Sequence, residues 1–594
     1  MTGATRPVVE STPLYSRTPV EADKGVVAGG HEESARAGAA MLALGGSAVD
    51  ALVAGAFAGM VAEPSSCGPG GWAQISVWDP ASGRSLTFDG YMTVPAAARQ
   101  DLFEIDRSRP PTFYGYPWTV GQKSEQGILS PAVPGAVSAF CDAHAMFGKL
   151  PLKVVLGPAI GLAEAGQPFA WYDKLRIAEN IRHIERDPDM AAVLLPNGKP
   201  PTIPVISPDG DRIATPALAT TLKRIAMHGR DGFYRGPTAM AIDRYIRKRG
   251  GILSADDLAA YRTRIFGERP RRYRGHDYTT GFDQVSVQAL SMLDGYDLAA
   301  AGPDSVRYRH LMAEVLGVAY TDSVVHFGDP DFVEAPVTGL GNPDYGARRR
   351  RDLRLSRAMA RPIPAGDPWP YDVAEWSPER VTPAPDRQRV TRAELAATAG
   401  RRTTASFDGT SQVVAADSDG MMAATMYSIG FGFGFATYVP EVGVFLNNSM
   451  KNFDPRPGYP NSIRPGQRPL FAAPALVMSR RGRPRFAGAG SGGYRVETGV
   501  LHALVNHVDH GMALQAAVDH PRVHCQGMET YVDARIPAAV RQRLATMGHD
   551  VVVVREMPGT LNFGRVACLA WNSRRRTWSA AAAPVWQTGV AGVG

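Results

Sequence analysis

The chain has few cysteines and no long apolar run, and each shortage excludes a class of protein. The 594 residues contain four widely scattered cysteines, Cys67, Cys141, Cys525 and Cys568. No two of them stand at metal-binding or redox spacing, so free thiols are expected. The longest apolar run, 48–62, contains Asp50 and is too short to cross a bilayer. Residues 1–24 lack a basic segment followed by an apolar one, so no secretion signal is expected.

A strong charge of one sign is also missing. The formal net charge is +7, which is small for this length and comes mostly from arginine. The one dense basic run, 348–351 with Arg354, has no aromatic residues among it and is interpreted as a solvated helix face. His502, His507 and His510 share one stretch but lack the His-Glu-x-x-His spacing of a zinc helix. The sequence therefore predicts a soluble cytoplasmic protein with no metal, cofactor, nucleic-acid or membrane partner.

The order of predicted elements indicates a mixed α and β protein. Residues 32–62 have helical spacing interrupted at Gly45-Gly46, which predicts two closely packed helices. Most of 134–310 is also helical in pattern. Residues 362–409 are rich in proline, arginine, threonine and alanine, which predicts an exposed, flexible connector. The chain beyond this connector is strand-rich, and residues 1–25 are expected to form an unstructured arm.

The junction between the connector and the strands carries the most informative motif. Thr410 follows Gly409 and opens an apolar stretch, residues 417–420 supply an Asp-Ser-Asp-Gly turn, and a second apolar stretch begins at Met421. This pattern predicts a β-hairpin with Thr410 as the first residue of its first strand. If the chain were cut before Thr410, that residue would carry a hydroxyl nucleophile and an α-amine, which titrates at about pH 8 and can act as a general base. An ordinary surface hairpin is the other interpretation.

A glycine-rich loop is the second local signal. Residues 486–495 follow an apolar strand, precede a predicted helix over 496–508, and match Gly-x-Gly-x-x-Gly. A dinucleotide site is one interpretation, but no acidic residue ends a strand about 20 residues further on. A second interpretation is that the backbone N–H groups of Gly492 and Gly493 stabilise a developing oxyanion. The plainest interpretation is a tight strand-to-helix turn.

With these motifs the chain resembles the γ-glutamyltranspeptidase family of N-terminal-nucleophile hydrolases. The resemblance covers nearly the whole length, and its shorter motifs occur in the family's order. Before the connector they are Gly25–Ala28, Gly45–Ala51, Pro134-Gly135, Gly148–Leu152 and Gly250–Tyr261. After it they are Leu446–Asn448, Pro457-Gly458, Arg468–Leu470, Ser491–Gly493 and Pro521-Arg522.

The resemblance implies a fold and a maturation step. The implied fold is α+β, a four-layer αββα sandwich formed by both parts of a self-cleaved precursor. The Gly409–Thr410 bond matches the family's cleavage site, which would give a large fragment, 1–409, and a small catalytic fragment, 410–594. The pair Thr403-Thr404 is a poorer match, because only Thr410 keeps an ungapped spacing to the motifs that follow.

The resemblance also implies the catalytic groups. Thr410 matches the nucleophile, and Ser428 matches the hydroxyl residue that hydrogen-bonds and helps to activate it. Gly492 and Gly493 match the pair that stabilises the oxyanion. The implied reaction has two steps: Thr410 attacks a substrate carbonyl, and the resulting ester is released to water or to an amine.

Four departures from the family pattern concern the groups that hold the substrate. Where the family has an arginine, an aspartate, an asparagine and a pair of serines around the glutamyl group, this chain has Tyr91, Asn452, Gly430 and Phe471-Ala472. The guanidinium that pairs with a carboxylate and the carboxylate that pairs with an ammonium are both absent. The departures predict a larger, more aromatic and less charged pocket, and a substrate other than glutathione.

Three functions are compatible with this resemblance. The main expectation is hydrolysis or transfer of an acyl group through a Thr410 ester, as in similar cephalosporin acylases. One alternative is the family branch in pyrrolobenzodiazepine, hormaomycin and lincomycin biosynthesis, which hydrolyses a carbon–carbon bond in a pyrroline precursor. The other alternative is an uncleaved homologue that binds without catalysis. A small-molecule substrate and the two fragments of the chain itself are the partners expected.

Overall fold

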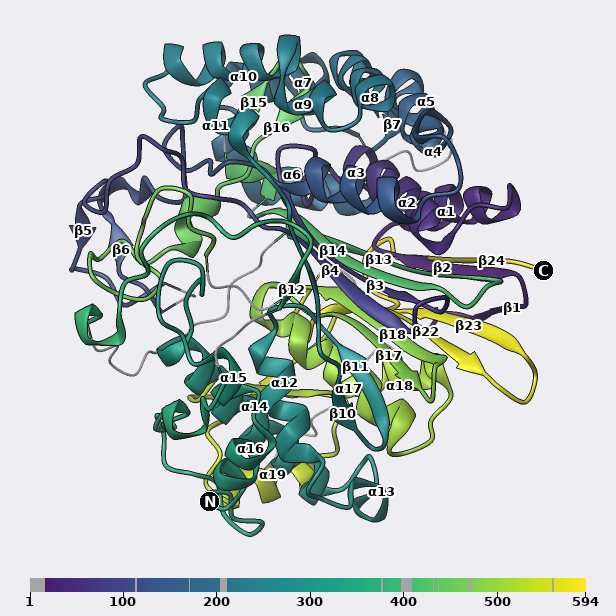
Figure 1. Cartoon of the computed structure of the whole chain (residues 1–594), viewed down its shortest axis with the longest axis vertical. Helices are drawn as coiled ribbons and strands as arrows, with labels where there is room; N and C mark the ends of the chain where they lie inside the picture. The colour runs from purple at the N-terminus through teal and green to yellow at the C-terminus, as the bar shows by residue number, and fades with distance from the viewer. Residues whose placement is uncertain are drawn as a thin grey trace, which may run out of the picture.

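Two β-sheets lie face to face at the centre of the molecule, and helices cover the outer face of each (Figure 1). This computed structural model describes residues 16–112, 115–169, 171–202, 211–374, 378–396, 409–430, 432–435, 437–469, 473–557 and 560–594. The mixed α and β class expected from the sequence is confirmed.

The first sheet has eight strands in the order β12-β9-β4-β3-β14-β13-β2-β24, and every pairing in it is antiparallel. Its strands are β2 (Gly25–Gly29), β3 (Trp72–Asp79), β4 (Arg84–Gly90), β9 (Arg264–Gly267), β12 (Glu379–Arg380), β13 (Gly409–Asp417), β14 (Met422–Gly430) and β24 (Gly589–Val593). The hairpin predicted from the sequence is therefore confirmed as β13–β14, with Gly409 as its first residue.

The second sheet has seven strands in the order β1-β23-β22-β18-β17-β11-β10, again all antiparallel. Its strands are β1 (Val20–Ala22), β10 (Arg271–Tyr273), β11 (His276–Thr279), β17 (Ala475–Arg480), β18 (Arg483–Ser491), β22 (Arg565–Asn572) and β23 (Thr577–Ala582). Short pairs and a small third sheet are formed by β5 (Ile105–Asp106), β6 (Trp118–Thr119), β7 (Gln167–Pro168), β8 (Arg212–Ile213), β15 (Tyr438–Val439), β16 (Val444–Phe445), β19 (Val523–Cys525), β20 (Thr530–Asp533) and β21 (Val551–Val554).

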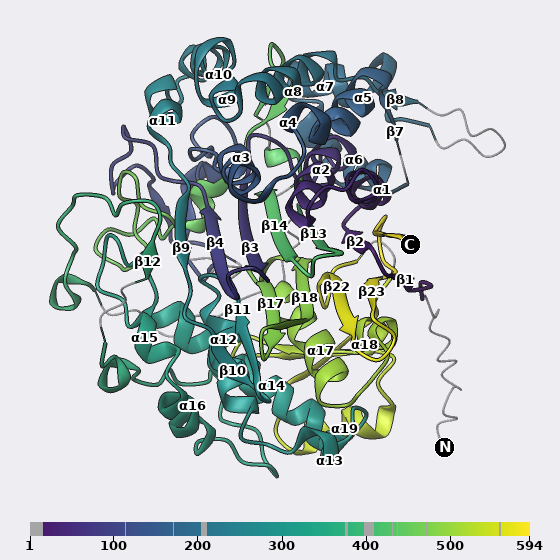
Figure 2. The same ribbon diagram turned by 45° about the vertical axis from the view of Figure 1, so that its right-hand side comes forward.

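The helices divide between the two outer faces (Figures 1 and 2). Over the first sheet lie α1 (Glu32–Ala43), α2 (Ala48–Ala62), α3 (Ala136–Phe147), α4 (Leu152–Val155), α5 (Gly157–Ala165), α6 (Trp171–Ile184), α7 (Pro188–Leu194), α8 (Pro216–His228), α9 (Asp231–Tyr234), α10 (Gly236–Lys248) and α11 (Ala255–Ala260). Over the second lie α12 (Gln284–Leu293), α13 (Leu298–Ala301), α14 (Val306–His326), α15 (Val337–Leu340), α16 (Pro343–Arg350), α17 (Val496–Val508), α18 (Leu514–Asp519) and α19 (Ala538–Thr546).

The unbroken apolar sequence of strand β13 is explained by the burial of both of its faces. Val414 and Ala416 pack toward the second sheet, whereas Val413 and Ala415 pack toward the helices, because successive side chains of a strand point to opposite faces. Both faces are buried, so no polar alternation remains. A strand of this kind lies at the centre of the molecule, and its first residues are correspondingly well fixed.

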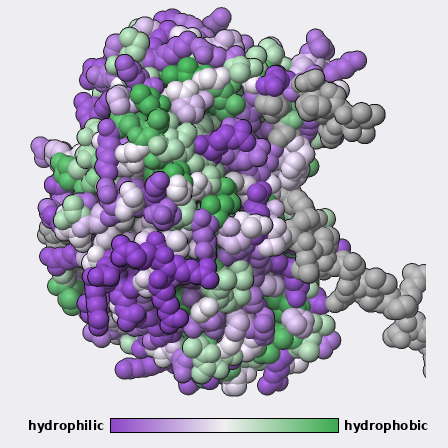
Figure 3. All heavy atoms as spheres, turned by 90° about the vertical axis from the view of Figure 1, so that its right-hand side faces the viewer, coloured by the Kyte–Doolittle hydropathy of each residue, from purple (hydrophilic) through white to green (hydrophobic). Residues whose placement is uncertain are grey.

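The two helices predicted over 32–62 are confirmed as α1 and α2. Ser47 caps α2, accepting a hydrogen bond from the Asp50 N–H while the Asp50 carboxylate accepts one from the Ser47 N–H. Every residue of α2 is buried. Within the described ranges, no helix is both long and apolar enough to cross a membrane. On the face shown in Figure 3, apolar side chains are scattered among hydrophilic ones.

Both sheets combine strands from before and after the Gly409–Thr410 bond. In the first sheet β13 pairs with β2, and β14 pairs with β3. In the second sheet β17 pairs with β11, and β23 pairs with β1. A cut between Gly409 and Thr410 would leave these ladders in place, so the two fragments would remain one folded body.

Two segments differ from the simplest expectation. Residues 20–22 form β1 and pair with β23, so the unstructured arm expected over 1–25 is wrong there; residues 1–15 lie outside the described part. In the connector, β12 pairs with β9, and the Ala396 N–H donates to the Gly458 carbonyl at 2.9 Å. Most connector side chains that the structure describes are exposed.

Candidate active site

Thr410 lies at a bulge in the hairpin. Gly409 pairs with Gly430 and Ser411 pairs with Tyr427, so the register shifts by one residue at Thr410. Ser428 and Ile429 of β14 together lie opposite Thr410, so the extra residue is on β14, and a bulge of this kind re-aims the side chains next to it. Thr410 is only 1% exposed, which places its hydroxyl inside the protein while the chain is uncut.

Two hydroxyl groups converge on the carbonyl oxygen of the bond before Thr410. The Thr410 hydroxyl lies 2.8 Å from the Gly409 carbonyl oxygen and 3.2 Å from Ser428 Oγ. Ser428 donates to the same Gly409 oxygen at 2.5 Å and accepts a hydrogen bond from the Gly430 N–H at 2.8 Å. The arrangement runs from Thr410 through Ser428 to the carbonyl, so it can move the hydroxyl proton to the oxygen of the bond under attack.

Gly409 fits its place because it has no side chain. A Cβ there would lie 2.7 Å from the Ser65 carbonyl oxygen and 3.0 Å from Ser66 Cα. Gly430, opposite, has φ +91°, and a Cβ on it would lie 2.1 Å from Asn448 Oδ1. Both strands therefore approach their neighbours at glycine, next to the Gly409–Thr410 bond.

Gly409→Ala is expected to slow self-cleavage by about 10- to 100-fold, since overpacking of this kind costs about 1–3 kcal/mol and shifts the attacked carbonyl. The rate is measured from the fraction of cut chain on denaturing gels after synthesis. Gly161→Ala is the matched control, because a Cβ there meets nothing within 4 Å. Equal cleavage rates in both variants would contradict the prediction.

The glycine loop follows the central strand of the other sheet. Ser491 ends β18, Gly492 has φ +127° and Gly493 has φ +57°, and α17 begins at Val496. The strand and helix predicted around this loop are confirmed. Left-handed backbone at two consecutive positions requires glycine, and it turns the chain sharply at a helix start, where N–H groups lack intrahelical partners.

Arg565 joins the nucleophile strand to the glycine loop. This fully buried side chain donates to the Thr410 carbonyl oxygen at 2.8 Å and to Ser491 Oγ at 2.9 Å. It also donates to Glu63 Oε1 and to the Gly30 carbonyl oxygen, both at 2.9 Å. A guanidinium offers five donors in a rigid plane, so a single side chain fixes four chain segments.

Glu63 extends this junction to the residue after the nucleophile. It is 2% exposed, and its Oε2 accepts a hydrogen bond from Ser411 Oγ at 2.5 Å. A Cβ on Gly30 would lie 2.2 Å from Ser411 Oγ and 3.0 Å from Arg565 Nη2. Sequence reasoning missed both Arg565 and Glu63. The available signal was a single charge flanked by apolar residues, which must be paired when it is buried.

Tyr91 lies near the end of the first sheet that carries Ser428, with Trp72 between the two residues. Ser428 pairs with Trp72 across β14 and β3, and the Trp72 and Tyr91 rings lie 4.9 Å apart. The predicted pocket residue Tyr91 is therefore separated from Ser428 by one aromatic side chain. Trp72 and Tyr91 are both buried, and together they form an aromatic wall, called here the Tyr91 wall.

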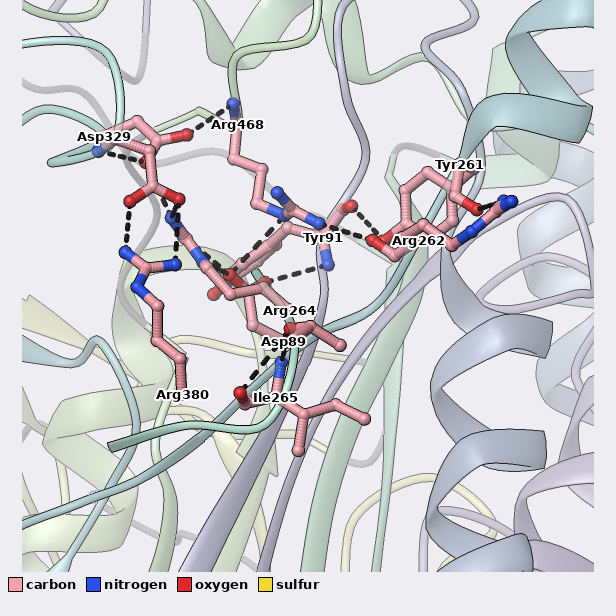
Figure 4. Close-up of polar contacts among 11 residues, drawn as sticks. Asp89, Tyr91, Tyr261, Arg262, Arg264, Ile265, Asp329, Arg380 and Arg468 are labelled. Atoms are coloured by element: carbon pink, nitrogen blue, oxygen red, sulfur yellow. Dashed lines mark hydrogen bonds and ion pairs between the residues drawn. The ribbon is translucent and has the colours of Figure 1, made fainter. Parts of the chain in front are cut away.

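A buried network of arginine and aspartate fixes the backbone around Tyr91 (Figure 4). The Tyr91 N–H donates to Asp89 at 3.0 Å, and the Tyr91 carbonyl accepts from Tyr261 Oη at 2.7 Å. Arg264 pairs with Asp89 at 2.6 Å and with Asp329 at 2.7 Å. The Arg468 N–H donates to Asp329 at 2.9 Å, so the network also fixes the approach to 471–472.

The remaining predicted pocket residues differ in how they are placed. Gly430 lies opposite Gly409 and beside Asn448. Asn452 is 3% exposed, and its Oδ1 has no hydrogen-bond partner among the residues that the structure describes. Phe471 and Ala472 lie outside the described residues.

Two buried carboxyl groups act electrostatically on Tyr91. Burial raises the pKa of Asp283 to about 6 and raises the pKa of Glu497 well above its usual range. Together with Asp89, these carboxylates add to the effect of burial in raising the pKa of Tyr91. The pocket wall is thus a poor environment for an additional negative charge.

Asp283→Asn is expected to stabilise the protein at pH 7 by about 2–3 kcal/mol and to have no effect at pH 4. The folded state binds a proton here more tightly than the unfolded state, so wild-type stability falls as pH rises from about 4 to about 6, and asparagine removes this loss. The difference in apparent melting temperature between the variant and wild type, taken at pH 7 and at pH 4, measures this stabilisation. Asp297→Asn, at an exposed helix N-cap, is the control. An equal shift at both pH values would contradict the prediction.

One cluster in the described part of the chain has metal-ligand chemistry, away from Thr410. It consists of His310, Glu314 and His549. The His310 and His549 rings are hydrogen-bonded to each other at 2.7 Å, and Arg361 forms an ion pair with Glu314. The guanidinium already supplies the positive charge, so the cluster is an internal polar network.

The comparisons with known proteins agree with this geometry. The γ-glutamyltranspeptidase family model matches residues 34–593, and the chain belongs to this family, as an enzyme of the hydrolase and transferase class. The Acylase ACY 1 proenzyme of Pseudomonas sp. (strain SE83) is 34% identical over 558 residues, which are 92% of this chain and 90% of that protein. The glutathione hydrolase proenzyme of Bacillus subtilis (strain 168) is 30% identical over 545 residues, 90% of this chain and 86% of that protein.

Solved structures show the same fold over the full length. The cephalosporin acylase from Bacillus halodurans has a TM-score of 0.80 at 24% identity and covers 100% of this chain and 99% of its own. The structure named LmbA2991HD has a TM-score of 0.78 at 25% identity, with 98% and 100% covered. The family predicted from the motifs is therefore confirmed.

Proposed function

We propose that the chain cuts itself between Gly409 and Thr410 and then works as a hydrolase whose nucleophile is Thr410. The observation that carries the proposal is the convergence of the Thr410 and Ser428 hydroxyls on one carbonyl oxygen, at 2.8 and 2.5 Å. An ordinary hairpin has no need of two hydroxyls at the carbonyl that precedes its first threonine. The proenzymes among the relatives support the same maturation.

The cleavage proceeds without an outside reagent other than water. Thr410 Oγ attacks the Gly409 carbonyl carbon while its proton passes through Ser428 to the carbonyl oxygen. The C–N bond then breaks, the nitrogen takes up a proton, and an ester joins Gly409 to Thr410 Oγ. Water hydrolyses this ester, which leaves a carboxylate on Gly409 and a free amine and hydroxyl on Thr410.

The matured site would use the same residues in a second role. The Thr410 amine takes the proton from its own hydroxyl, Oγ attacks the substrate carbonyl, and the Gly492 and Gly493 N–H groups stabilise the oxyanion. After cleavage Ser428 no longer donates to the Gly409 carbonyl, and its hydroxyl orients Thr410 Oγ. The interleaved sheets would hold the two fragments together throughout, as one small-molecule enzyme.

The substrate would not be a γ-glutamyl compound. Tyr91, Asn452 and Gly430 stand where charged and amide groups would clamp a glutamyl carboxylate and ammonium, and Asp283 and Glu497 disfavour an added carboxylate at the Tyr91 wall. The acyl group therefore needs a different recognition pattern.

γ-Glutamyl-p-nitroanilide is expected to be hydrolysed at least about 30-fold more slowly than by a glutathione hydrolase, because loss of a charge-assisted clamp costs about 2–5 kcal/mol. Release of p-nitroaniline by the fully cut protein measures this, with the Bacillus subtilis enzyme as the positive control. Comparable rates would show that the glutamyl clamp is retained elsewhere.

The bond that is broken has two candidates, an amide and a carbon–carbon bond. The full-length match to LmbA2991HD, with the resemblance to the antibiotic-biosynthesis branch, favours the carbon–carbon bond. There Thr410 Oγ would attack a ketone next to an enamine carbon, the C–C bond would break, and that carbon would take a proton from the Thr410 ammonium. The 34% identity to an acylase favours the amide.

A matched pair of substrates separates the two candidates. One is a pyrroline enaminone carrying an acyl group on its enamine carbon, and the other is the p-nitroanilide of the same acyl group. Mass spectrometry of the released acid, in parallel with Thr410→Ala, gives both rates. Faster release from the enaminone supports carbon–carbon hydrolysis, and faster release from the anilide supports an acylase.

A further inference from the structure

Helix α6 reaches the neighbourhood of Thr410 from the helical layer. A Cβ on Gly432 would lie 3.0 Å from Arg176 Nη2 and 2.9 Å from Asn180 Nδ2. Gly432 stands two residues beyond Gly430, which pairs with Gly409 across the hairpin. The α6 face that carries Arg176 therefore lies beside the strand end that holds the scissile bond.

A second, independent path connects α6 to the same point. The Tyr172 ring stacks on Trp586, with ring centroids 4.2 Å apart. On the other side, the Arg565 guanidinium lies 4.1 Å from the Trp586 ring, and it donates to the Thr410 carbonyl. Tyr172 and Arg176 are one helical turn apart, so both paths start from one face of α6.

This face carries buried donors that have no acceptor. Within the described residues, Tyr172 Oη and Arg176 Nε on α6, and Nε1 of the Trp586 ring stacked on Tyr172, lack a hydrogen-bond partner. Tyr172 is 2% exposed, Trp586 5% and Arg176 8%, so bulk water does not satisfy these donors. An unsatisfied buried donor costs about 1–3 kcal/mol, which makes three together a feature that calls for an explanation.

The charges around Tyr172 place these donors in one electrostatic environment. Burial raises the pKa of the Tyr172 hydroxyl, while the Arg176 and Arg565 charges act in the opposite direction and Glu63 adds to the rise. Arg176 Nη1 pairs with Glu179 at 2.5 Å, but Glu179 is half exposed and leaves the Nε side of the guanidinium unpaired. Arg176 is thus paired with Glu179 and Arg565 with Glu63, so these four charges balance, and what distinguishes the region is its unpaired donors.

The backbone on both sides of this region is strained. Trp586 has φ +60° and Phe433 has φ +56°. Left-handed backbone is rare for bulky aromatic residues and persists where the surroundings impose it, often at binding sites. The strain holds Trp586 against Arg565 and turns the Gly432 loop toward α6.

We propose that Tyr172, Arg176 and Trp586 form a subsite that binds a carboxylate of the substrate beside Thr410. The proposal deepens the proposed function and rests on it. A carboxylate accepts several hydrogen bonds at once and pairs with a guanidinium, so it is the class of ligand that buried N–H and O–H donors of this kind suit. The subsite lies across the hairpin from the Tyr91 wall, which fits a substrate whose acid group binds elsewhere than in a glutamyl clamp. The carboxylate that cleavage creates on Gly409 has the same chemistry and is the other source of such a ligand.

Glutaryl-p-nitroanilide and pentanoyl-p-nitroanilide test the subsite, since they differ only by a carboxylate in place of a methyl group. For Arg176→Gln we expect about a 10- to 100-fold loss of kcat/KM on the glutaryl compound, mostly in KM, and less than about a threefold change on the pentanoyl compound. Trp586→Phe is expected to give a smaller loss of the same kind. Arg182→Gln, an exposed arginine on the same helix, is the matched control.

The proposal is overturned by an unchanged ratio of kcat/KM for the two substrates in Arg176→Gln, whether both values fall equally or neither changes. If self-cleavage is also slower, Arg176 acts in the cleavage of the precursor, in which Gly409 carries no carboxylate. Binding of glutarate and of glutaramide to the cut protein, measured by calorimetry, is independent of turnover. Arg176-dependent binding of glutarate alone, without hydrolysis of either anilide, would support the subsite while removing the proposed hydrolase function.

Discussion

Thr410→Ala is expected to yield one uncut chain of 63.7 kDa with no turnover on any acyl substrate. The variant lacks the oxygen that attacks Gly409, and it lacks the amine that cleavage would release. The effect is total rather than partial because one atom, Thr410 Oγ, is the nucleophile of both reactions. Denaturing gels and intact mass measure the first loss, and product release from the substrate pair measures the second.

Two variants control this result. Thr410→Ser keeps the hydroxyl and is expected to cut itself, at a lower rate because it loses the methyl group that restricts χ1. The double variant Thr403→Ala/Thr404→Ala, at the alternative threonine pair, is expected to cut like wild type. Cleavage that persisted in Thr410→Ala and stopped in the double variant would move the nucleophile to that pair.

Arg565→Met is expected to abolish or nearly abolish self-cleavage and to lower the free energy of unfolding by about 3–5 kcal/mol. The methionine leaves Glu63 buried without its cation and releases the Thr410 carbonyl and Ser491 together. The nucleophile strand then loses its fixed relation to the glycine loop, and sub-ångström placement of the attacking oxygen is lost. The fraction of cut chain and the apparent melting temperature are the two readouts.

The two effects can be separated by further variants. Arg575→Met removes an exposed arginine, paired with Glu21, and is expected to change neither readout. Arg565→Met/Glu63→Gln removes the uncompensated charge and is expected to recover part of the stability but not the cleavage. Recovery of cleavage in the double variant would show that Arg565 acts on stability alone.

The hairpin could be predicted from the sequence because its apolar strands and its turn are local signals, whereas the role proposed for Ser428 comes from the resemblance to the family. Thr410 and Ser428 lie on adjacent strands of one hairpin, and the spacing between them fixes their register. The glycine loop was equally accessible, since left-handed backbone at a strand-to-helix turn leaves a glycine signature. The need for glycine at position 409 became visible only in the structure, through the close approach of Ser65 and Ser66.

The pairing of Arg565 with Glu63 beside the hairpin could not be predicted, because the two residues meet only in the folded chain. Arg565 and Glu63 are 502 positions apart, and neither occurs in a motif. Arg176 and Trp586 likewise come from distant segments, a surface-layer helix and the last turn of the chain. Contacts of this kind follow from how the two sheets and their helical layers stack, which no local pattern specifies.

The most direct test of the account is the intact mass and N-terminal sequence of freshly purified wild-type protein. The account predicts two polypeptides that co-purify under native conditions, one ending at Gly409 and one beginning Thr-Ser-Gln-Val-Val. A single uncut chain would leave the Thr410 nitrogen in an amide, without a base for catalysis. It would contradict the hydrolase mechanism and leave a binding protein on the same fold.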